Sequence, residues 1–135
     1  MTYLIAYVAA LVVFFLADMV WLGTMVNRIY RPALGDFLLS SVNAPPATLF
    51  YLLYPLGLVI FAIVPGLKTG SFVTALILGS LFGLFTYGTY DLTNQATLRN
   101  WSTLLTIADM TWGSVLGGLS AGSAAWIVSK FVHQA

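Results

Sequence analysis

The sequence of 135 residues contains no cysteine, no glutamate, one histidine and few charged side chains. Without cysteine, disulfides, thiolate chemistry and Cys-based metal sites are excluded. Charged residues make up 7% of the chain, against about 25% in an average soluble domain. That share is too small to cover the surface of a soluble fold of this size. A net charge of +1 without a basic stripe also excludes a nucleic-acid-binding surface.

Hydrophobic residues make up 60% of the chain and give it a mean hydropathy of +0.95. A bilayer-spanning helix needs about 20 mostly apolar residues. Four stretches meet this length, at about residues 2–23, 47–67, 71–90 and 104–131. None alternates polar and apolar residues as the strands of a membrane barrel do. The sequence therefore predicts an all-α membrane protein: a single integral membrane domain built as a bundle of four transmembrane helices, with both termini on one side.

The first stretch is expected to remain as a helix, because no Lys or Arg precedes it and no small-x-small cleavage site follows it. Residues 65–70 carry strong helix breakers and predict a tight turn between the second and third helices. Residues 24–46 form a longer connection, with a short interfacial helix bounded by Pro32 and Gly35. Residues 91–103 predict a polar connection into the fourth helix.

Small residues recur at four-residue spacing on the third and fourth stretches. Gly79 and Gly83 lie on the third, and Gly113, Gly117 and Ala121 lie on the fourth. Small residues at this spacing let two membrane helices approach closely. We therefore expect the third and fourth helices to pack tightly against each other.

Three aspartates are expected in one leaflet, because successive helices cross the membrane in alternate directions. Asp18 lies late in the first stretch, Asp91 ends the third, and Asp109 lies early in the fourth. An Asp at the centre of a membrane helix costs about 2.5 to 3.5 kcal/mol. Such acids need the bundle interior, water or a partner, and they mark candidate functional sites. The first, third and fourth helices are thus predicted to line a polar pocket.

The predicted ligand-binding residues combine these acids with nearby aromatic, amide and basic side chains. They are Asp18, Asp91, Asp109, Trp21, Trp112, Tyr87, Tyr90, Asn94, Arg28 and Arg99. The aromatic rings would form the walls, and Arg28 or Arg99 would neutralise an acid in the empty pocket. Neither a metal site nor a cofactor is predicted. His133, near the end of the chain, is expected to be a tail residue rather than a ligand.

Several functions are compatible with these residues. The leading hypothesis is a pocket that binds a cation or an amphiphile with a polar head, with proton- or cation-coupled transport as an extension. An alternative is a membrane-embedded lipid-modifying enzyme that uses Asp for metal or acid–base chemistry. A further alternative is a structural or accessory subunit whose acids only pair with arginines. Membrane lipids are expected partners, and a transporter of four helices would work as a homodimer.

Three patches carry a resemblance to a known family. They are Ala17-Asp18-Met19-Val20-Trp21-Leu22-Gly23, Tyr90-Asp91-Leu92-Thr93-Asn94 and Asp109-Met110-Thr111-Trp112-Gly113. In these patches, and over nearly its whole length, the chain resembles a bacterial domain-of-unknown-function family of short inner-membrane proteins. The resemblance implies a multi-pass protein of the bacterial inner membrane. It implies no activity and assigns no catalytic residue.

Overall fold

The computed structural model describes residues 1–132, so the expectation for His133 lies outside the described residues. The chain forms four helical stretches. The first comprises α1 (Thr2–Met25), the π-helical segment η1 (Val26–Tyr30), α2 (Arg31–Leu34) and the 3-10 turn η2 (Gly35–Phe37). The second comprises α3 (Ala44–Leu58), the π-helical segment η3 (Val59–Ile63) and α4 (Val64–Thr69). The third and fourth are α5 (Phe72–Thr97) and α6 (Thr103–Phe131).

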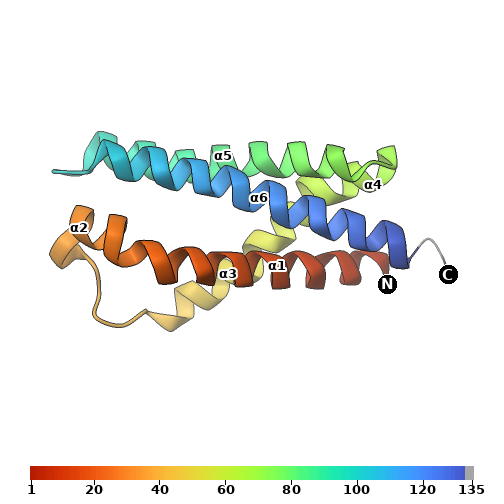
Figure 1. Ribbon diagram of the computed structural model, residues 1–135, viewed down its shortest axis with the longest axis horizontal. Coiled ribbons are helices and arrows are strands. Elements are labelled where there is room, and N and C mark those ends of the chain that lie inside the picture. The colour runs from red at the N-terminus through yellow and green to blue at the C-terminus, as the bar shows by residue number, and fades with distance from the viewer. Residues whose placement is uncertain (133–135) are drawn as a thin grey trace.

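The predicted all-α membrane fold is confirmed. Three stretches are long and apolar enough to cross a membrane: Thr2–Phe37, Ala44–Thr69 and Phe72–Thr97. Helix α6, the fourth predicted span, is not among these three. Its 29 residues make it about 43 Å long, which is enough to cross a membrane, but it carries many Gly, Ala and Ser residues and is extensively buried. Figure 1 shows α6 beside α5 and packed on α1, with the start of α1 and the end of α6 at the same end of the bundle, as predicted.

Several of the predicted helices are shorter than the observed ones. The first helix continues past Gly23 because no strong breaker follows until Pro32, which occupies the first turn of α2. Proline is tolerated there because the first N–H groups of a helix have no intrahelical partner. Pro65 likewise begins α4, so the predicted turn shrinks to Gly70, whose φ of 71° is left-handed, and its neighbour Ser71. Helix α5 extends past Tyr90 into the predicted polar connection.

The close approach of α5 and α6 is confirmed by their glycines. A Cβ atom at Gly83 would clash with the backbone carbonyl of Gly113, and one at Gly79 would clash with the carbonyl of Gly117. The Ser114 hydroxyl also donates a hydrogen bond of 3.0 Å to the Ser80 carbonyl across this contact. Because backbones touch here, the register between α5 and α6 is fixed by sterics rather than by side-chain fit.

Helix α3 is the irregular member of the bundle. Pro55 lies inside it and removes one backbone donor, and η3 follows one turn later. Figure 1 shows α3 lying beside α1 and crossing the bundle toward α4. Many of the large apolar side chains of α1 and α3 are exposed on the outside of the bundle, where lipid would cover them.

Candidate functional site

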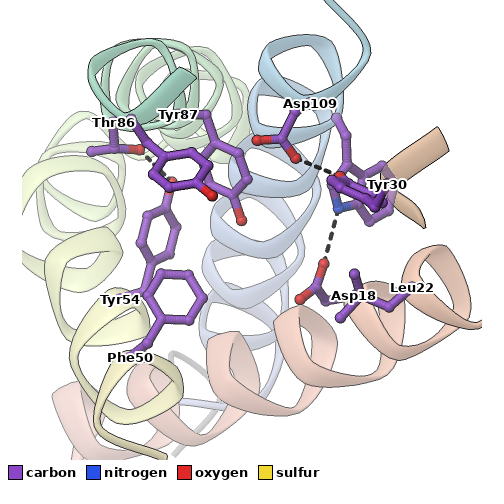
Figure 2. Close-up of a pocket in the computed structure, with 10 residues that line it drawn as sticks. Asp18, Leu22, Tyr30, Phe50, Tyr54, Thr86, Tyr87 and Asp109 are labelled. Atoms are coloured by element: carbon purple, nitrogen blue, oxygen red, sulfur yellow. Dashed lines mark hydrogen bonds between the residues drawn. The ribbon is translucent and has the colours of Figure 1, made fainter. Parts of the chain in front are cut away.

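A cavity of about 450 Å³ lies between the helices, and Figure 2 shows the side chains around it. We call it the inner cavity. Its lining residues are Asp18, Leu22, Tyr30, Phe50, Tyr54, Thr86, Tyr87, Tyr90, Asp109 and Trp112. They come from α1, η1, α3, α5 and α6, so the second helical stretch contributes as well as the three that were expected. Binding cavities for small ligands commonly have volumes of about 300 to 1,000 Å³.

Asp18 is held by donors from two other helices. Its Oδ2 accepts a hydrogen bond of 2.5 Å from the Tyr51 hydroxyl of α3. Its Oδ1 accepts one of 3.0 Å from the indole Nε1 of Trp112 on α6. The side chain is only 6% exposed. Each carboxyl oxygen of this buried side chain therefore has a hydrogen-bond donor from another helix.

Asp109 has a comparable arrangement on the opposite wall. Its Oδ1 accepts a hydrogen bond of 2.5 Å from the Tyr30 hydroxyl, and that hydroxyl accepts one of 2.9 Å from the indole Nε1 of Trp21. Tyr30 reaches this position from η1, where one backbone bond skips to the fifth residue along. Such π-helical turns are frequent at functional sites because they rotate the following side chains.

The indole rings of Trp21 and Trp112 stack in parallel, with centroids 4.6 Å apart and planes 4° apart. The Trp112 ring lines the cavity and its Nε1 donates to Asp18, whereas Trp21 does not line the cavity and its Nε1 donates to the Tyr30 hydroxyl. The two tryptophans occupy equivalent places in the repeated words Ala-Asp-Met-Val-Trp and Ala-Asp-Met-Thr-Trp. Of the two tryptophans expected in the aromatic wall, Trp112 lies in it, and Trp21 stacks on Trp112 without lining the cavity.

The remaining wall is formed mainly by aromatic residues of α3 and α5. Tyr54 donates a hydrogen bond of 2.9 Å to Thr86, whose own hydrogen is directed to the Phe82 carbonyl. The Tyr87 ring lies edge-on to Tyr54, with centroids 6.0 Å apart. In Figure 2 the Tyr87 hydroxyl points into the cavity, toward the space between Asp18 and Asp109.

Other predicted site residues lie away from the inner cavity. Asp91 is completely buried and does not line it. Asn94 and Arg99 line an outer cavity of about 510 Å³, formed by the α2–η2 region and the α5–α6 connection. Tyr90 lines both cavities. Arg28 is exposed and lines neither.

The expectation that Arg28 or Arg99 neutralises an acid is wrong. Both arginines are exposed, and tyrosine and tryptophan side chains donate to Asp18 and Asp109 in their place. Arg31, also exposed, donates to the Asn27 side chain one turn earlier in the chain. Extension of the first helix carries Arg28 and Arg31 beyond the depth of Asp18, because each added residue advances about 1.5 Å.

One known protein family covers nearly the whole chain. Residues 3–126 match the family model described as "Predicted membrane protein (DUF2177)". The chain belongs to this family. The match confirms the resemblance inferred from the three patches and covers every residue that lines the inner cavity. No curated protein and no solved structure matches the chain.

Sequence reasoning missed several residues of the site. They are the cavity-lining Tyr30, Phe50, Tyr54 and Thr86, and Tyr51, which donates to Asp18. Tyr30 was placed in a connection because the first helix was ended too early. The available signal was the lack of any breaker between Gly23 and Pro32. Tyr51 and Tyr54 resemble ordinary interfacial anchors, which tyrosines near a membrane boundary usually are.

The donor set limits the chemistry of the inner cavity. Among residues 1–132, no group of three or more His, Asp or Glu side chains is arranged to hold a metal ion. Two carboxylates and several aromatic faces line the space, and no Lys or Arg does. Such a cavity favours positive charge on a bulky, weakly hydrated group, since aromatic faces attract cations.

Proposed function

We propose that the inner cavity binds the head group of an organic cation, of the amine or quaternary-ammonium class, carried by an amphiphile. The observation that supports this best is the pairing of Asp18 and Asp109 around one aromatic-lined space without a basic lining residue. Two carboxylates in a membrane interior attract a cation strongly, since the low dielectric strengthens their field. The rings supply the contacts that quaternary ammonium groups prefer.

The dimensions and surroundings of the cavity support an amphiphile rather than a bare ion. About 450 Å³ exceeds what a dehydrated metal ion needs. Leu22 and Phe50 add apolar wall beside the acids, and Phe50 is also partly exposed on the outer surface of α3. A tail could therefore leave between α1 and α3 into lipid while the head remains between the acids.

This proposal includes the setting of the protein. We place it in the bacterial inner membrane, with lipids or lipid-like cations as its partners. Transport of the bound cation is an extension, in which a homodimer supplies a pathway that four helices are too few to enclose. Enzymatic modification of a lipid and a purely structural role are the competing outcomes.

The test measures binding of dodecyltrimethylammonium to the purified protein in maltoside micelles by calorimetry and by tryptophan fluorescence. We expect saturable binding, with dodecyl sulfate showing none. Asp18→Asn and Asp109→Asn should each weaken binding at least about tenfold, since loss of a buried charge partner costs several kcal/mol. Asp36→Asn is the matched control, because Asp36 is exposed in the η2 turn.

In Asp18→Asn the amide oxygen can accept from the Trp112 indole, and the Tyr51 hydroxyl can rotate to accept from the amide nitrogen. In Asp109→Asn the amide oxygen can accept from Tyr30, so both variants should keep the fold. Equal binding by wild type and both variants would contradict the proposal. Loss of thermal stability alone, without any change in binding, would favour a structural role. A changed lipid extract in expressing cells that depends on the two acids would favour an enzyme.

A further inference from the structure

The inner cavity is backed by a buried carboxyl group that the proposed function does not use. Asp91 is 0% exposed on α5, and neither of its carboxyl oxygens has a hydrogen-bond donor among the residues that the structure describes. A buried polar group without a partner costs free energy and calls for an explanation. A fully ionised, unpaired carboxylate is especially unfavourable in such a place.

The register of α5 and α6 places Asp91 next to Asp109. Gly83 lies against Gly113 and Gly88 against Met110, so one further turn along α5 brings Asp91 to the turn of α6 that precedes Met110. This register places the buried Asp91 carboxyl beside the turn of α6 that holds Asp109. Two ionised carboxylates have only acceptor atoms and repel each other.

We propose that Asp91 and Asp109 share one proton and that a cation entering the inner cavity displaces it. Displacement of the proton by a cation rests on the proposed function, whereas the shared proton does not. One proton turns two mutually repelling acceptors into a hydrogen-bonded carboxylic acid–carboxylate pair. A cation beside Asp109 supplies the positive charge instead, so both acids ionise and the proton leaves to water or buffer. Cation binding and proton binding thus oppose each other, as linkage requires.

The groups around the pair are consistent with this exchange. Asp109 also receives the Tyr30 hydroxyl from η1, Tyr90 is the chain neighbour of Asp91 on α5, and Asp18 of α1 faces the same cavity from the opposite wall. No Lys or Arg forms an ion pair with either acid within residues 1–132. Tyr90 lines the outer cavity as well as the inner one.

The first experiment needs no ligand. Infrared spectra of the protein at neutral pH should contain the carbonyl stretch of one protonated carboxylic acid. Asp91→Asn should remove it, and Asp109→Asn should shift its frequency because the carboxylate that accepts the hydrogen bond is lost, whereas Asp18→Asn and Asp36→Asn should leave it unchanged. Absence of the band in wild type, its persistence in Asp91→Asn, or an unchanged frequency in Asp109→Asn would overturn the shared proton.

The second experiment measures proton release by calorimetry of dodecyltrimethylammonium binding in two buffers of different ionisation enthalpy. We expect release of about one proton per bound cation, and affinity that rises with pH by up to about tenfold per unit. Asp91→Asn should bind the cation with no proton release and no pH dependence. Equal release by wild type and Asp91→Asn, or binding by wild type without release, would overturn the coupling.

The two experiments separate this inference from the proposed function. If wild type binds no dodecyltrimethylammonium at any pH, the proposed function and the coupling both fail, and the infrared band alone decides whether the pair shares a proton. If binding occurs without proton release, the proposed function stands and the coupling fails.

Discussion

The indole of Trp112 donates its hydrogen bond to Asp18, which belongs to the other copy of the repeated Ala-Asp-Met-x-Trp word. Trp21 donates to the Tyr30 hydroxyl, and this hydroxyl donates to Asp109. Each tryptophan thus supports the acid of the opposite helix, and the stacked rings join the two arrangements. The recurring word therefore describes one reciprocal site rather than two separate ones.

Removing the indole donor of Trp112 should test this reciprocity. We expect Trp112→Phe to keep the ring stack but to leave one oxygen of Asp18 without a donor, which should lower the free energy of unfolding by about 1 to 3 kcal/mol. The thermal midpoint in maltoside micelles reports the change. Trp126→Phe is the control, since Trp126 is exposed on α6 and should alter the midpoint little. Equal effects of the two variants would argue against the hydrogen bond.

Tyr30 and Asp109 should be energetically coupled. Tyr30→Phe removes the hydroxyl that donates to Asp109 and accepts from Trp21, and Asp109→Ala removes the acceptor, so we expect each variant to be destabilised. In the double variant the two losses should be less than additive, with a coupling free energy of about 0.5 to 3 kcal/mol. Thermal or denaturant unfolding of the four proteins gives this value. Strict additivity would mean that the two side chains act independently.

A methyl group at the α5–α6 contact should separate the helices. The added Cβ of Gly83→Ala would meet the Gly113 carbonyl, so we expect a loss of about 1 to 3 kcal/mol or failure to fold. Gly23→Ala is the matched control, because nothing lies within 4 Å of its added Cβ. That variant should be as stable as wild type or slightly more stable, since alanine favours the helix. Thermal unfolding distinguishes the two.

The arginines should be dispensable for cation binding. Arg28→Gln and Arg99→Gln change exposed side chains that contact neither Asp18 nor Asp109, so we expect dodecyltrimethylammonium affinity to change less than about twofold at moderate salt. Calorimetry measures the affinity directly. An increase of tenfold or more in either variant would instead show that an arginine competes with the cation for an acid.

The sequence predicted the helical membrane fold, the side-by-side termini and the α5–α6 contact, because these depend on apolar length, alternate crossing and small-residue spacing. It also identified Asp18, Asp109 and Trp112, whose burial within a membrane helix is unusual. It did not predict Tyr30, although the missing breaker between Gly23 and Pro32 indicates that the helix reaches this residue. The π-helical turn that directs its side chain, however, depends on tertiary contacts that leave no periodic pattern. It also assigned charge neutralisation to arginines, since composition alone does not show that phenol and indole donors reach the acids first.

The two walls of the inner cavity differ in how firmly they are held. Backbone touches backbone where α5 meets α6, so the wall carrying Tyr87 and Asp109 has almost no freedom to shift. Phe50 and Tyr54 stand on α3, whose hydrogen-bond ladder is interrupted at Pro55 and widened in η3. Any opening of the site toward lipid would therefore occur by bending of α3, while the α5–α6 wall that carries Asp109 stays in place.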